Sequence, residues 1–234
     1  MALPKLASAK YELTVPSTGD KVEFRPFLVK EEKVLLMAQQ TGSVKDQMSA
    51  IKDIIHNCTF GKVDANNVPF FDLEYMFLQL RAKSVGESTK VSVTCPDDNE
   101  TKVTVDVNLA EIECVRNVEN NPNIDLGNGI GVVLKYPQID IMEKADEVTK
   151  DASKAFDIIK GCIDNIYDKD NVYPRSEMDE KELDEFIESL THGQFEKMQT
   201  FFQTMPRVKH NVKVKNPKTG VQSDVVLEGM ASFF

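Results

Sequence analysis

The sequence has few of the features that mark membrane proteins, metalloproteins or enzymes. Tryptophan is absent, only three histidines occur, and no apolar run approaches the roughly 18 residues that a membrane span needs. The N-terminal stretch has no apolar signal core, so we expect a protein that begins in a cytoplasm. No P-loop, HExxH, G-x-S-x-G or GxGxxG motif is present. The sequence therefore predicts a protein without enzymatic activity and without a cofactor.

Cysteine pairs of the kind that hold zinc are also lacking. The four cysteines are widely spaced and should be free thiols in a reducing compartment. The turn "CPDDNE" begins as a zinc knuckle does, but Asp98 stands where the second cysteine after Cys95 would be. The turn "NPKTG" has Asn216 and Thr219 at the same spacing, so only one of four thiolate positions is filled. We predict no bound metal, with Cys95 as the last apolar residue of a strand.

Excess positive charge is absent as well. The net charge is −10, and residues 91–234 hold 27 Asp+Glu against 16 Lys+Arg. The densest acidic run is 176–189. This balance argues against nonspecific binding of nucleic acid and favours solubility and docking onto a basic protein surface. A solvated helix face is the alternative explanation of the acidic run.

Hydrophobic spacing predicts the secondary structure. We expect helices near 28–42, 44–58, 71–87, 151–167, 178–190 and 191–205, and hairpins at 11–26, 91–107 and 208–229. The spacing indicates an α+β fold of helical lobes with antiparallel β-hairpins, in which helix exceeds strand. Two similar hairpins, each after a helical block, suggest an N-terminal lobe over 1–125 and a C-terminal lobe over 126–234, unless both form one compact domain.

Two longer stretches carry a resemblance to a known family. "FRPFLVKEEKVLLMAQQ" and "FDLEYMFLQLRAKSVGE" resemble the baseplate hub and hub-assembly proteins of contractile-tailed, T-even-type bacteriophages. The "CP" turn and an end formed by a hairpin, a glycine and "FF" are similar too. Some members carry paired cysteines in these turns, and this chain departs from them, so the resemblance does not bring a zinc site with it.

The resemblance implies a non-enzymatic component or assembly factor of the tail baseplate hub. Its partners would be other hub or tail proteins, and a homo-oligomer is also compatible with the resemblance. Neither nucleic acid nor a membrane is expected as a partner. It would be made in the host cytoplasm and either stay in the virion tail baseplate or leave after assembly.

The C-terminal hairpin is the predicted partner interface. Phe233 and Phe234 are adjacent aromatic residues at a chain end, which must be buried either in the protein's own core or in a partner's pocket. Lys209, Lys213 and Lys215 would steer an acidic partner surface or a second copy of the chain.

Two other kinds of function stay open from the sequence. A small nucleic-acid-binding module built on eroded zinc hairpins would use Arg207 with Lys209, Lys213 and Lys215. A hydrolase would use His192 with acids from 176–188, and would need a single cleft that holds them.

Overall fold

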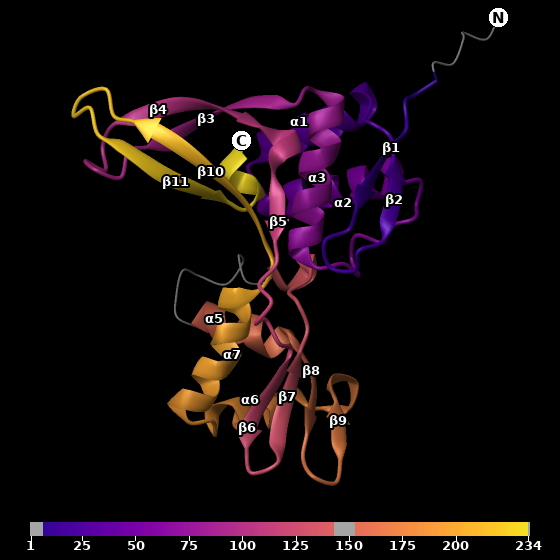
Figure 1. The fold of residues 1–234 in the computed structure, drawn as a ribbon. Helices are drawn as coiled ribbons and strands as arrows, with labels where there is room; N and C mark the ends of the chain where they lie inside the picture. The colour runs from indigo at the N-terminus through magenta and orange to yellow at the C-terminus, as the bar shows by residue number, and fades with distance from the viewer. Residues whose placement is uncertain (1–6, 143–152, 234) are drawn as a thin grey trace, which may run out of the picture. The chain divides into compact units, whose positions relative to one another are not determined.

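The computed structural model describes residues 7–142 and 153–233, and the chain forms two compact units (Figure 1). Unit 1 comprises Met1–Val115 and Pro206–Phe234, and unit 2 comprises Arg116–Met205. The division differs from a single cut at residue 125, because the C-terminal hairpin belongs with the N-terminal elements. Each unit has its own hydrophobic core.

The α-helices described in unit 1 follow one another in the chain: α1 (Val29–Thr41), α2 (Val44–Cys58) and α3 (Phe70–Ser84). Gly42 ends α1 in the left-handed region with φ of 67°, and the Ser43 hydroxyl caps α2 by accepting from the Asp46 N–H. The spacing predicts an apolar face on the second and on the third helix, and most of these side chains are buried: Ile51, Ile55, Cys58, Leu73, Met76, Phe77 and Leu80. The start of the predicted stripe on the second helix is wrong, because Val44 is exposed and Met48 is only half-buried.

The strands of unit 1 form antiparallel sheets whose register matches the alternation of valines. Two of these sheets are two-stranded: β1 (Tyr11–Thr14) with β2 (Lys21–Phe24), and β3 (Ser88–Thr94) with β4 (Lys102–Asn108). The third joins β11 (Gln222–Glu228), β10 (Arg207–Lys215) and β5 (Glu113–Val115) in that order. The pairing of β5 with β10 places Val115 directly opposite Arg207. The two points where the chain leaves and re-enters unit 1 are therefore adjacent.

Unit 2 is built on a four-stranded antiparallel sheet in simple sequence order. Its strands are β6 (Asn123–Gly127), β7 (Ile130–Leu134), β8 (Ile163–Tyr167) and β9 (Val172–Pro174). The core of this unit is shared by the sheet and by three helices: α5 (Ser153–Gly161), α6 (Glu180–Glu188) and α7 (His192–Thr204).

The helix predicted over 151–167 is wrong in its second half. The chain leaves the helix after Gly161, and Ile163 and Ile166 lie on β8, where Ile166 is paired with Val132 of β7. Their helical spacing is also compatible with a short buried strand, and cross-strand pairing decides between the two. The part of the prediction over 151–152 lies outside the described residues.

The expected fold class of helical lobes with attached hairpins also needs correction. The described part of the chain is mixed, with 40% helix and 29% strand, so helix does exceed strand, but only slightly. The strands also form more than isolated hairpins. Unit 2 contains a four-stranded sheet, and in unit 1 a three-stranded sheet joins β5 to the C-terminal hairpin. In the part of the chain that the structure describes, no helix is both long and apolar enough to cross a bilayer.

Candidate functional site

Two hairpin turns of unit 1 meet at their tips. The Asn216 side-chain amide donates hydrogen bonds to Asp97 at 3.0 Å and to Asp98 at 2.9 Å. The Thr219 hydroxyl donates to Asp97 as well. The turns that the sequence compares with zinc knuckles therefore lie against each other, although they are more than 100 residues apart in the chain.

The chemistry of this junction suits hydrogen bonding better than metal binding. Asp98 accepts from the Thr101 hydroxyl at 2.6 Å and from two backbone N–H groups, and these bonds lower the pKa of its carboxyl group. The hydroxyl of Thr219 and the amide of Asn216 likewise lower the pKa of Asp97. Each carboxylate thus has neutral donors in place of a cation.

Cys95 at the same junction is a neutral thiol. Its side chain is fully buried, and burial, together with the neighbouring carboxylates of Asp97 and Asp98, raises the pKa of the thiol. A protonated thiol is a poor metal ligand, because zinc binds the thiolate. Among the residues that the structure describes, no three His, Cys, Asp or Glu side chains gather in a way that could hold a metal ion.

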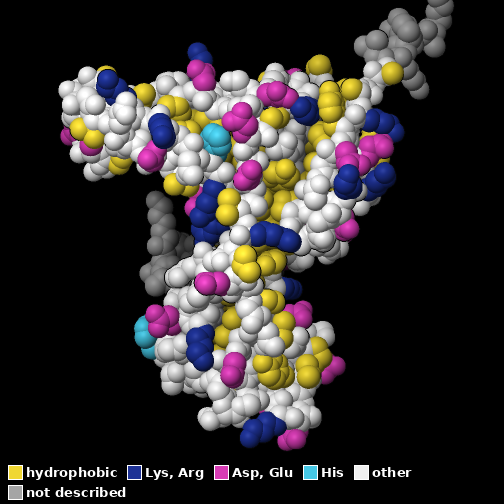
Figure 2. All heavy atoms as spheres, in the orientation of Figure 1, with side chains coloured by type: hydrophobic (Ala, Val, Ile, Leu, Met, Phe, Trp, Pro, Cys, Tyr) yellow, Lys and Arg dark blue, Asp and Glu magenta, His cyan; other side chains and the backbone are white. Residues whose placement is uncertain are grey.

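The lysines of the predicted interface lie on one side of β10. Burial alternates along this strand: Lys213 and Lys215 are exposed, whereas the valines of the opposite face are buried, namely Val208, Val212 and Val214. Lys209 pairs with Glu228 at 3.4 Å, and Lys213 lies opposite Asp224. Over this hairpin, basic side chains are interspersed with acidic ones on the face shown in Figure 2. A mixed surface of this kind suits protein contacts better than a nucleic-acid backbone.

The structure places Phe233 inside unit 1. It belongs to the short 3-10 helix η3 (Met230–Phe233), and its side chain is fully buried. The Met230 N–H at the start of η3 donates to the Glu74 carboxylate at 2.9 Å, which fastens this segment to α3. Phe234 lies outside the described residues. The burial of Phe233 favours the explanation in which this aromatic ring belongs to the protein's own core.

The structure reveals a surface on α1 that hydrophobic periodicity did not predict. The helix buries only Glu31 and Ala38, whereas Val29 is 79% exposed and Val34, Leu36 and Met37 are exposed too. The apolar block of this segment is continuous and lacks helical spacing, which is the signal in the sequence that it has no single buried face. Exposed apolar side chains clustered on one element are typical of interaction surfaces.

Glu31 anchors α1 from its buried side. Its carboxylate pairs with Arg25 at 2.8 Å and accepts from the Leu28 N–H at 2.7 Å. Burial opposes ionisation of Glu31, but these hydrogen bonds outweigh it and lower the pKa of the carboxyl group. The buried side of α1 therefore carries an ion pair beside a small apolar contact at Ala38.

Among the described residues, His192 does not line the hollow that contains the acidic side chain of Glu182. His192 is the first residue of α7, and Asp168 is the other acid that lines this hollow of unit 2. The Thr191 hydroxyl caps α7 and accepts from the Gln194 N–H, as the T-x-x-Q spacing predicts.

Comparison with known proteins gives one consistent result. Residues 8–234 match the family described as T4 bacteriophage base plate protein. The baseplate hub assembly protein gp26 of Enterobacteria phage T4 is 25% identical over 228 residues, which covers 96% of this chain and 98% of that protein. No solved structure matches.

Proposed function

Because the chain belongs to the T4 bacteriophage base plate protein family, we propose that it builds the central hub of the phage tail baseplate through contacts with other proteins. Its role in the baseplate is structural or assembly-related. The observation that carries this conclusion is the match with a hub assembly protein from end to end, through both units. A match confined to one unit would leave the function of the other unit open.

The role is non-enzymatic in this proposal. Support comes from the described residues, in which the hollow lined by Glu182 does not include His192 and no group of metal-binding side chains occurs. The exposed apolar side chains of α1 and the lysine-bearing side of β10 are surfaces of the kind that protein partners use. The partners are other hub or tail proteins, met in the host cytoplasm during assembly.

Co-purification from infected cells tests this function. A tagged chain, expressed at its natural level, should recover more of the baseplate hub proteins than the tag alone recovers from a matched infected culture. Loss of the chain should leave tails without complete baseplates. Recovery of no tail protein, together with normal baseplates in its absence, would refute the proposal.

Purified virus particles decide between the two forms of the role. We propose that a hub component stays in the particle at a fixed copy number, whereas an assembly factor is recovered only from intermediates. Quantitative mass spectrometry of mature particles and of baseplate intermediates measures both amounts.

A further inference from the structure

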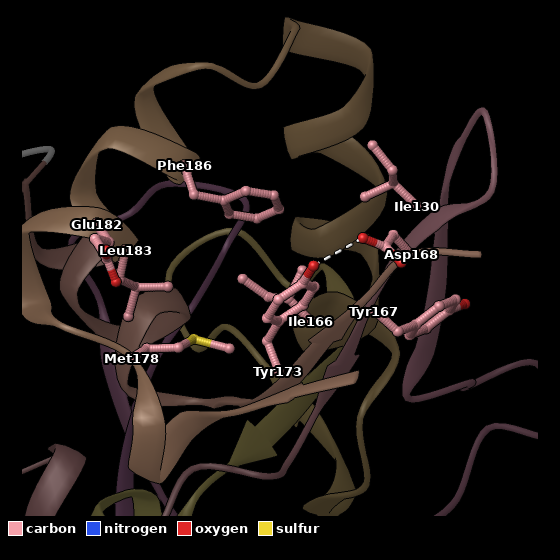
Figure 3. A pocket seen from close by; sticks show the side chains of 9 residues that line it. All are labelled: Ile130, Ile166, Tyr167, Asp168, Tyr173, Met178, Glu182, Leu183 and Phe186. Atoms are coloured by element: carbon pink, nitrogen blue, oxygen red, sulfur yellow. Dashed lines mark hydrogen bonds between the residues drawn. The ribbon is translucent and has the colours of Figure 1, made fainter. Parts of the chain in front are cut away.

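Unit 2 has an apolar hollow of about 280 Å³ at one end of its sheet. Met178, Leu183 and Phe186 face Ile166 and Tyr173 across it, as Figure 3 shows. Leu183 belongs to the core, whereas Met178 and Phe186 are only half-buried. The hollow is thus a gap between α6 and the strands β8 and β9 that the core does not fill.

The apolar lining of the hollow extends onto the surface. Ile130 is 41% exposed and Tyr173 is 45% exposed, and both line the hollow. Hydrophobic side chains gather over the β7 to β9 part of unit 2 in Figure 2. A volume slightly below the roughly 300–1,000 Å³ of pockets for drug-sized ligands is suited to one large apolar side chain.

The only charged side chains that line the hollow, among the described residues, are Asp168 and Glu182. Asp168 accepts from the backbone N–H groups of Asp170 and Asn171 at 2.8 Å and from the Tyr173 hydroxyl at 2.9 Å. These bonds lower the pKa of Asp168, so a fixed negative charge lies at the rim.

Two of the nearby cations, Lys160 and Arg175, are already paired with other acids. Lys160 contacts Glu180 at 2.9 Å and also Asp184, and Arg175 contacts Glu180 as well. Within the described part of the chain, no cation pairs with Glu182. Unit 2 as a whole holds 19 Asp+Glu against 10 Lys+Arg, so it carries −9 of the protein's net charge of −10. The environment of the hollow favours a positively charged occupant.

We propose that this hollow is a docking pocket for a protein segment that presents one large apolar side chain flanked by lysine or arginine. The side chain fills the space beside Phe186 and Met178, and the flanking cations meet Asp168 and Glu182. The inference rests on the proposed function, since the segment belongs to another protein of the hub or tail. It adds the chemistry by which that partner is recognised.

A synthetic peptide provides the test. The probe is a fluorescent six-residue peptide with a central Leu-Phe pair and two lysines on each side, and its anisotropy is measured as the full-length protein is added. Two control peptides replace the lysines by glutamates or the Leu-Phe pair by serines. We expect the lysine-flanked peptide to bind at least tenfold more tightly than either control, and binding to weaken as salt rises.

Two variants of the protein locate the binding. Glu182→Lys reverses a charge at the rim, and Ile130→Ser removes part of the exposed apolar lining. Each substitution should weaken binding of the lysine-flanked peptide about tenfold. Glu188→Lys is the matched control, because it makes the same charge change on α6 at a residue that does not line the hollow. Melting temperatures verify that all three variants fold.

Several outcomes would overturn the proposal. Equal binding of the control peptides, or equal loss in Glu182→Lys and Glu188→Lys, would indicate general attraction to an acidic surface. A dimer of the wild-type protein that Ile130→Ser dissociates in sedimentation would assign the hollow to a second copy. If the wild-type chain and Glu182→Lys recover equal amounts of hub proteins from infected cells, the proposal that the hollow binds the partner is wrong, while the proposed function stands. If the wild-type chain recovers none, the proposed function itself fails.

Discussion

Asn216 joins its own turn to the turn that contains Asp97 and Asp98, which lie 119 and 118 residues earlier in the sequence. Its side chain is nearly completely buried and donates to both Asp97 and Asp98. Asn216→Ala removes these donors and should lower the free energy of unfolding by about 2 kcal/mol. Urea denaturation measures this change, and Asn211→Ala, at an exposed residue of the preceding strand β10, should be close to neutral.

The same junction predicts a dependence of stability on pH. Hydrogen bonds lower the pKa of Asp97 and Asp98 from the ordinary value of 3.8, so the folded state favours their ionised forms. Their contribution is present above that value and is lost as the pH falls from about 4 towards the lower folded-state pKa. Acid titration of stability should therefore be less steep in Asn216→Ala than in the wild-type protein. Equal slopes in the two proteins would contradict this account.

Metal content is a separate test of the junction. We predict that the purified protein contains no stoichiometric metal, since Cys95 is a buried thiol whose pKa is raised and its neighbours already have donors. Treatment with a chelator should leave the melting temperature unchanged. Elemental analysis that gives about one zinc ion per chain would overturn the prediction.

The C-terminal element η3 is predicted to contribute mainly to stability. Phe233→Ala removes a fully buried ring and should destabilise the protein by about 3–5 kcal/mol. Deletion of Phe234 alone separates the two explanations of the aromatic end. Loss of hub partners at an unchanged melting temperature would assign Phe234 to an interface.

Truncation of an apolar side chain on α1 should leave the stability of the protein nearly unchanged, in contrast to truncation of Phe233. Leu36→Ala changes an exposed side chain and should alter the free energy of unfolding by less than about 0.5 kcal/mol. Leu80→Ala on α3 is the matched change in the core and should cost about 2–5 kcal/mol. A large loss of stability in Leu36→Ala would mean that this face of α1 is covered within the protein's own fold.

At this scale the sequence predicts elements well where a single period decides them. The stripe through Ile51 and Ile55 and the alternation of Val91 with Val93 both lead to the observed structure. Ile163 and Ile166 mislead, because their spacing fits a helix and only pairing with β7 makes them a strand. The sequence shows the junction at Asn216 only as two turns with the same spacing, and contact between these turns depends on the fold of the whole of unit 1.

The whole molecule is organised by a discontinuity that a local pattern cannot reveal. Unit 1 uses residues from both ends of the chain, and nothing near 115 or 206 differs in composition from an ordinary loop. The pairing of Val115 with Arg207 predicts that unit 2 can be removed. Replacing residues 116–206 by Asn-Gly should close β5 and β10 as a hairpin with a two-residue turn.

This shortened chain should retain a cooperative fold. We expect a single unfolding transition in urea, with a smaller slope than the full-length protein because less surface is exposed on unfolding. Circular dichroism and size-exclusion chromatography measure the fold and the size. Aggregation, or a gradual transition without cooperativity, would show that unit 1 depends on unit 2.

The adjacency of Val115 and Arg207 also sets a timetable for synthesis. All of unit 2 is translated before residues 206–234, so for a time the growing chain contains the whole sequence of unit 2 while unit 1 still lacks its C-terminal strands. At about 5–20 residues per second, synthesis of those last strands takes a few more seconds. During that interval the edge of β5 lacks β10, and the partners of Asp97 and Asp98 have not been translated. The N-terminal part of the chain is therefore made first but completed last.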